Sequence, residues 1–158
     1  MSDLVQNQIQ FEHPLLLTIA LTLMAGCDTD NNQIHIDFNA VAPIPDSVLK
    51  AFSGIETQRL VRWHVTENAT DVEIDSDNLI IRFKTIHHHP KGVVEALHAQ
   101  LPGCWVWKFA SEVYGFDIGY YEATGSHRTF IDMSYASEPA IKQFTDELWL
   151  RHIHREGA

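Results

Sequence analysis

The segment TDVEIDSDNLIIRFKT, residues 70–85, constrains the fold more than any other part of the chain. Apolar and charged side chains alternate on both sides of Ser76 and Asp77, which is the pattern of two half-buried strands joined by a turn. Folding the segment about those two residues pairs Ile74 with Leu79, Val72 with Ile81 and Asp71 with Arg82. Both apolar sets then lie on one face, so the sequence predicts a β-hairpin from Thr70 to Lys84 with its carboxylates in water.

These carboxylates are the strongest charge feature of the chain: Asp71, Glu73, Asp75 and Asp77. Neighbours on one face of a strand are about 7 Å apart, so their repulsion in water is only about 0.6 kcal/mol per pair. The simplest interpretation is a solvated face that pairs with Arg82 and Lys84 across the hairpin. The alternative is an acidic protein-binding face that imitates phosphates, although a DNA strand carries about twice this charge density along its axis.

A strand and a short helix are predicted before the hairpin, in NQIHIDFNAVAPIPDSVLKAF. The strand covers 34–38, and a proline-containing loop follows it. Asp46 or Ser47 then caps a short helix. We expect the apolar residues of this helix to point inward: Val48, Leu49 and Phe52.

A helix, three strands and a final helix are predicted after the hairpin. The first helix covers 90–101, where apolar residues recur at helical spacing: Val93, Val94, Leu97 and Leu101. Three aromatic residues then mark the core side of a strand: Trp105, Trp107 and Phe109. Further strands are expected within 116–120 and 127–135, and Ser137 caps a helix with Ile141, Phe144 and Leu148 along one stripe. This order suits an α+β sandwich in which helices cover one face of a mostly antiparallel sheet.

The N-terminal segment HPLLLTIALTLMAGCD has the outline of a bacterial lipoprotein signal that ends at Cys27. Its apolar run, 15–26, is too short to span a bilayer, and no Lys or Arg precedes Cys27. A buried helix that begins at Pro14 and ends near Gly26 is therefore the preferred interpretation, with lipidation as the alternative.

Length and composition predict one domain, residues 1–158, with an N-terminal extension (1–32), a core (33–136) and a C-terminal helix (137–158). Eleven Lys and Arg against 21 Asp and Glu give a net charge of −10, which disfavours direct binding to nucleic acid. Two cysteines exclude a disulfide scaffold and favour reduced thiols in the cytoplasm. Neither cysteine is flanked by the residues that typically surround a catalytic nucleophile, and the chain has no phosphate-binding glycine loop.

Three consecutive histidines in TIHHHP lie where a strand is expected to lead into a helix. On a strand, His87 and His89 would share one side, which suits two imidazole ligands of a metal. A site needs further ligands, and the candidates lie far away in the sequence: His98, His127, His152 and His154. We expect no physiological metal or cofactor here, and a metal-dependent enzyme built on His87 and His89 is the alternative.

Several short motifs resemble the YubB-type ferredoxin-like proteins of plasmids and prophages. FNAVAPIP (38–45), NATDV (68–72), FKTIHHHPKGVVEALHAQLPG (83–103) and YGFDIG (114–119) match that family in order and spacing. Glu67 and His87 depart from the pattern, because the family tends to have aromatic residues there. The resemblance implies a ferredoxin-like sandwich and a mobile-element origin, and it brings no established reaction or catalytic residue.

The charge and the resemblance together predict a non-enzymatic, cytoplasmic accessory protein of a phage or plasmid. We expect it to bind a host protein, with no direct contact to nucleic acid or membrane, and a homodimer is a further possibility. A partner that itself binds nucleic acid would suit the acidic face, as for an inhibitor of CRISPR or restriction systems. The candidate binding residues are Asp71, Glu73, Asp75 and Asp77.

Overall fold

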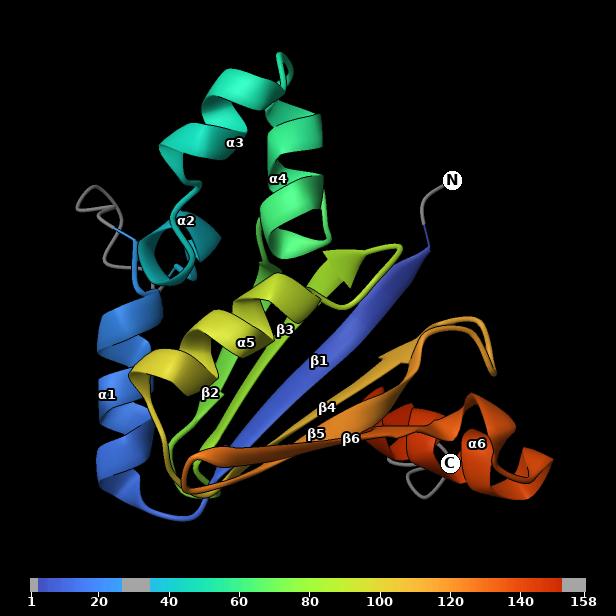
Figure 1. Ribbon diagram of the computed structural model, residues 1–158. Coiled ribbons are helices and arrows are strands. Elements are labelled where there is room, and N and C mark those ends of the chain that lie inside the picture. The colour runs from blue at the N-terminus through green and yellow to red at the C-terminus, as the bar shows by residue number, and fades with distance from the viewer. Residues whose placement is uncertain (1–2, 27–34, 152–158) are drawn as a thin grey trace.

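The computed structural model describes residues 3–26 and 35–151. They form an α+β protein with one open, six-stranded antiparallel sheet and several helices (Figure 1). The strands are β1 (Leu4–Phe11), β2 (Thr70–Asp75), β3 (Ile80–Ile86), β4 (Trp105–Ser111), β5 (Ile118–Thr124) and β6 (His127–Asp132). The helices are α1 (Pro14–Met24), α2 (Phe38–Val41), α3 (Asp46–Ala51), α4 (Ile55–Trp63), α5 (Lys91–Gln100), the 3-10 helix η1 (Met133–Tyr135) and α6 (Glu138–Leu148).

The strand order across the sheet is β2-β3-β1-β4-β5-β6. Helices α1 to α4 lie between β1 and β2 in the chain, and α5 lies between β3 and β4. From the sequence we expect residues 1–32 to form an extension outside the core. In the structure β1 instead lies in the middle of the sheet, where it pairs with β3 on one side and β4 on the other.

Strand β1 carries a buried polar residue on its core side. Val5, Ile9 and Phe11 face the core, and Asn7 lies among them with no exposed surface. The Asn7 amide donates to the hydroxyl of Thr85 at 3.0 Å, and its carbonyl oxygen accepts from Trp107 Nε1 at 3.0 Å. A buried amide is tolerated when its donors and acceptors are satisfied, so Asn7 fastens three neighbouring strands together.

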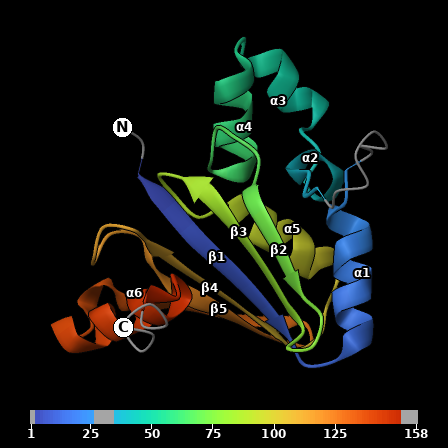
Figure 2. The ribbon, with the colours of Figure 1, turned by 180° about the vertical axis from the view of Figure 1, so that it is seen from behind.

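Helices cover both faces of the sheet. On one face, α5 packs on the main core, which contains Trp105, Trp107 and Phe109 (Figure 1). On the other face, α6 packs through Leu148, Ile141 and Phe144 against residues that include Ala110 and Ile118 (Figure 2). The expectation that helices cover a single face is therefore wrong. The physical reason is that β4 and β5 also place apolar residues on the second face, at Ala110 and Ile118, and these need a cover of their own.

The hairpin is present, with a register that differs from the expected one. Ile74 pairs with Ile81 rather than Leu79, because four residues (76–79) form the turn and Leu79 adopts the left-handed conformation, with φ 58°. The pairs of Glu73, Ile74 and Asp75 are offset by two residues from the expected ones, and a shift of two residues keeps each side chain on its face. The register changes between Thr70 and Glu73, so Thr70 pairs with Lys84. Val72 and Ile74 accordingly pack against the main core, as expected.

Most other elements agree with their sequence patterns. Helix α1 begins at Pro14 and is capped by the His13 side chain, and α6 is capped by Ser137. The strand expected at 34–38 is wrong over its described residues, because Ile36 forms only a single bridge with Ala25 and a helical turn begins at Phe38. Cys27, His152 and His154 lie outside the described residues.

Candidate functional site

Helices α3 and α4 project beyond the end of the sheet as a pair, which we call the arm (Figures 1 and 2). No residue of α3 is buried, and Trp63 is the one buried residue of α4. Trp63 attaches the arm to the body: its Nε1 donates to the Ala42 carbonyl at 2.7 Å, and its ring meets Phe38 edge to face at 5.7 Å. A polar contact adds to this attachment, because Arg62 Nε donates to the Pro43 carbonyl at 3.1 Å.

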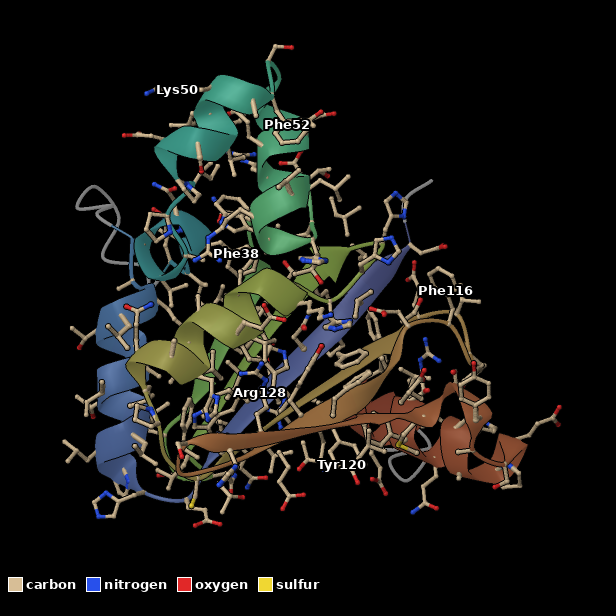
Figure 3. All side chains as sticks on the ribbon, in the orientation of Figure 1. Phe38, Lys50, Phe52, Phe116, Tyr120 and Arg128 are labelled. Carbon is tan, nitrogen blue, oxygen red and sulfur yellow. The ribbon has the colours of Figure 1, made fainter. Side chains whose placement is uncertain are left out.

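The arm carries large apolar side chains that the core does not use. Their exposed fractions lie between 38% and 54%, and we call them the arm surface: Leu49, Phe52, Ile55, Leu60 and Val61. The sequence pattern predicts that Leu49 and Phe52 point inward, and this prediction is wrong, because both side chains are exposed. Figure 3 labels Phe52 on the arm. The inward face of α4 is instead formed by Trp63 and by Arg59, one turn earlier, whose guanidinium lies 5.4 Å from the Trp63 ring centroid.

The predicted acidic face lies in solvent as expected, but cations of the neighbouring strand accompany it. Asp71 and Glu73 are exposed, and Lys84 Nζ lies 3.0 Å from Asp71 Oδ2. Asp75 turns to Asn78, whose side-chain and backbone N–H groups donate to it at 2.8 and 3.1 Å. These hydrogen bonds hold the pKa of Asp75 below its usual value.

The face is therefore less acidic than its carboxylates alone suggest. Asp77 is exposed in the turn, while Arg82 and Lys84 line a shallow cavity of about 120 Å³ together with Asp71 and Glu73. A surface of mixed charge imitates a row of phosphates poorly. This geometry favours the interpretation in which the hairpin carboxylates pair across to β3.

The three histidines have different environments. His87 and His88 are exposed, and His87 adopts the left-handed conformation just after β3 ends. His89 is half-buried, and its ring lies flat on Phe109, with ring centroids 3.7 Å apart. The strand geometry that would place His87 and His89 side by side is thus absent from this junction.

His89 forms a hydrogen-bonded chain with two distant residues. Its backbone N–H donates to Asp117 Oδ2 at 2.6 Å, and its Nδ1 lies 3.0 Å from the same carboxylate. A carboxylate accepts, so Nδ1 donates to Asp117, and Nε2 lies 2.7 Å from the Tyr121 hydroxyl, a group that can donate to it. Burial, followed by the nearby charges of Glu95 and Asp117, raises the pKa of Tyr121, so the phenol remains a donor.

This cluster fastens the start of α5 to β5 and leaves little reactive surface. A cavity of about 320 Å³ lies beside it and is lined by Leu60, His64, His88, His89, Lys91 and Asp117. Tyr121 is only 4% exposed, and both ring nitrogens of His89 are engaged within the chain. Within residues 3–26 and 35–151, no three His, Cys, Asp or Glu side chains lie where they could share a metal ion.

Sequence reasoning missed the arm surface and the partners of His89. Helix α4 was not predicted, although IETQRLVRW has the spacing of an amphipathic helix. Asp117 and Tyr121 lie 28 and 32 residues after His89, and no motif connects them. The signal for α4 was present in the sequence, whereas the signal for the histidine cluster was not.

Comparison with known proteins adds no relative. No family model, no curated protein and no solved structure matches this chain. None of the helices in the described ranges is long and apolar enough to cross a lipid bilayer.

Proposed function

We propose that this protein is a non-enzymatic binding protein and that another protein docks on the arm surface. The observation that carries this proposal is the exposure of five large apolar side chains on two projecting helices. Large apolar side chains exposed together on one element of a protein surface mark interaction sites. On α4 such side chains lie on several sides of the helix, because Ile55, Leu60 and Val61 are not three or four residues apart. Exposure on a projecting element also lets a partner enclose the patch from several sides.

The energetic scale fits a binding site. Full burial of a Leu, Ile, Val or Phe side chain contributes about 1.5–3 kcal/mol, and each residue of the arm surface is roughly half exposed. Covering the patch would therefore contribute several kcal/mol, which is the amount that a few hot-spot residues supply in protein interfaces. Leu60 and Ile55 are the most exposed members and the first candidates for such a role.

The strand order also supports the family resemblance. Strands β2-β3-β1-β4, with helical crossovers from β1 to β2 and from β3 to β4, have the order of a ferredoxin-like core. In this proposal β1 is the first strand of that core, and the hairpin of β5 and β6 extends the sheet. A ferredoxin-like core agrees with the YubB-type resemblance and hence with an accessory protein of a phage or plasmid.

Because the net charge of this chain is −10, we expect its partner to be a protein with a basic surface. Host proteins that bind nucleic acid have such surfaces, so inhibition of a CRISPR or restriction system is the corresponding role. The hairpin carboxylates Asp71, Glu73, Asp75 and Asp77 would then steer the partner toward the protein, while the arm surface supplies most of the affinity. Binding that relies on steering weakens as salt rises.

A capture experiment with matched variants tests the proposal. Tagged wild-type protein, an Ile55→Ser/Leu60→Ser variant and a Leu15→Ser control are exposed to lysate of cells that naturally carry the gene, and recovered proteins are quantified by mass spectrometry. Leu15 lies on α1 and is as exposed as the arm residues, at 59%. We expect one protein to be recovered by the wild type and the control, and about tenfold less by the arm variant. Equal recovery by all three would overturn the proposal.

A further inference from the structure

The two edges of the sheet differ in their capacity to pair with another strand. At one edge, β2 carries an irregularity between Thr70 and Glu73, and it bears a row of carboxylates that would repel a second copy. At the other edge, β6 is regular and pairs with β5 over its whole length. All six residues of β6 are exposed. An exposed, regular edge strand is a template for adding another strand.

The backbone of β6 presents three residues to an added strand. Gly103 and Gly125 exchange two backbone hydrogen bonds, and they lie in the same register as β4 and β5. Hydrogen-bonded and non-hydrogen-bonded pairs alternate in an antiparallel ladder, so the odd-numbered residues of β5 form hydrogen bonds with β4. The even-numbered residues of β5 form hydrogen bonds with β6. The β6 residues opposite those even-numbered residues are His127, Thr129 and Ile131. Their N–H and C=O groups therefore point toward β5. The outward backbone groups belong to the residues between and after them: Arg128, Phe130 and Asp132.

A symmetric pair of β6 strands has few allowed registers. Two antiparallel copies must place outward residues opposite outward residues, so the pair is centred on Thr129, Phe130 or Ile131. Centred on Phe130, every outward residue finds an outward partner, and Arg128 of each copy lies opposite Asp132 of the other. Centred on Thr129, Arg128 instead faces Phe130. Centred on Ile131, Phe130 faces Asp132. Only the register centred on Phe130 places opposite charges together at both ends of the pair.

The side chains of β6 agree with this register. Arg128 projects to the α5 face, where its Nη1 lies 2.9 Å from His98 Nδ1, and Phe130 lies on the same face, against Tyr121 (Figure 3 labels Arg128). Directly opposite residues in an antiparallel pair share a face. Phe130 is 48% exposed and stacks on Tyr121, with ring centroids 4.8 Å apart, so its outer half is available to a second Phe130.

Charges on an edge strand usually block pairing. Within each copy Arg128 lies against His98, and Asp132 accepts from the backbone N–H and the hydroxyl of Ser134. In the pair each of these charges would in addition face the opposite charge of the other copy.

We propose that two copies of this chain pair through their β6 edges, centred on Phe130, with Arg128 of each copy opposite Asp132 of the other. The pair continues the sheet across a two-fold axis and leaves the arm surface free. This inference is independent of the proposed function, because it uses a different edge of the molecule and a different partner.

Charge reversal at the two positions gives a test that includes its own rescue. Arg128→Asp places two carboxylates opposite each other at both ends of the pair, and Asp132→Arg places two guanidinium groups there. Sedimentation velocity over a concentration series should show a monomer–dimer equilibrium for the wild type. We expect each single variant to raise the dimer dissociation constant by about tenfold or more. Controls with the same charge changes are Lys50→Asp on α3 and Asp77→Arg in the hairpin turn, both away from β6.

Mixing the two single variants in equal amounts should restore dimers, because each Asp then faces an Arg in the heterodimer. The double variant Arg128→Asp/Asp132→Arg should also dimerise as the wild type does. Thermal unfolding by circular dichroism verifies that each variant is folded. A wild type that stays monomeric up to about millimolar concentration would overturn the proposal. So would dimers that persist in both single variants, or a mixture that fails to recover them.

Discussion

Helices α4 and α5 are neighbours of similar length, yet they use their apolar residues in opposite ways. Helix α5 buries most of its residues against the sheet, including Val93, Val94 and Leu97 with no exposed surface. Helix α4 buries Trp63 and turns Leu60 and Val61 to solvent. The apolar residues of α5 therefore stabilise the fold, whereas on α4 only Trp63 does so, and Leu60 and Val61 are available to a partner.

The largest expected difference comes from equivalent truncations in the two helices. Leu97→Ala should lower the free energy of unfolding by about 2–5 kcal/mol, because it leaves a cavity in the core. Leu60→Ala should change it by less than about 0.5 kcal/mol, since Leu60 is 47% exposed. Urea unfolding of both variants measures the contrast. Similar losses in the two variants would mean that α4 is packed as α5 is.

The contact between the two helices provides a second comparison. A Cβ at Gly92 would lie 1.8 Å from the Arg62 carbonyl oxygen, so Gly92→Ala must push α4 away from α5. We expect a loss of about 1–3 kcal/mol in the free energy of unfolding, together with faster amide hydrogen exchange in α4. Gly54→Ala is the matched control, because its new Cβ would meet only Thr57 Oγ1, at 3.8 Å. A stable Gly92→Ala variant with unchanged exchange in α4 would contradict this packing.

The histidine cluster at the start of α5 should have a smaller effect. Tyr121→Phe removes the donor to His89 Nε2 and should cost about 1 kcal/mol of stability, the typical net contribution of a buried hydrogen bond. Tyr135→Phe is the control, because Tyr135 is 90% exposed and lies in η1. Chemical denaturation of the two variants distinguishes them. An unchanged free energy of unfolding in Tyr121→Phe would contradict a stabilising hydrogen bond between Tyr121 and His89.

The end of α4 gives the smallest expected effect, and it depends on pH. Burial, then the charge of Lys91, lowers the pKa of His64, so the unfolded chain binds a proton there more readily than the folded chain does. Stability from this residue is therefore lost as the pH falls through about 6.5. His64 also adopts the left-handed conformation, with φ 70°, which glycine tolerates best.

His64→Gly should accordingly raise the free energy of unfolding by about 0.5–1 kcal/mol. The gain over the wild type should be largest at acid pH and should shrink as the pH rises above the usual pKa of histidine. Thermal unfolding of the wild type and of His64→Gly, at pH values below and above the usual pKa of histidine, measures this gain. A gain that grows with increasing pH would contradict the direction of the His64 pKa shift.

Much of the sheet and the helices that cover it could be predicted because their patterns are local. The alternation in the hairpin and the helical spacing of 90–101 specify which faces are buried, and the structure agrees. Strand β1 is not predicted from the sequence, because Asn7 interrupts its apolar side. The hydrogen-bond partners of Asn7 lie 78 and 100 residues away. A strand whose buried position depends on such distant partners leaves only a weak local signal.

The candidate site was harder to predict than the fold. The carboxylates of the hairpin are visible in the sequence, but their pairing with Lys84 depends on the register, which the turn at 76–79 determines. The outward orientation of Leu49 and Phe52 could not be predicted from their spacing, because an apolar stripe looks the same whether it faces a core or a partner. Only tertiary packing determines whether such a stripe is buried in the core or exposed to a partner.

Site-specific photo-crosslinking in the cells that naturally carry the gene is the most direct test of the proposed arm interface. A photoreactive phenylalanine analogue replaces Leu60 on the arm in one variant and Leu15 on α1 in another, two positions of comparable exposure. We expect a crosslink to one defined protein from position 60 and none to that protein from position 15. Equal crosslinking from both positions, or none from position 60 in a folded variant, would contradict the assignment of the arm as the binding surface.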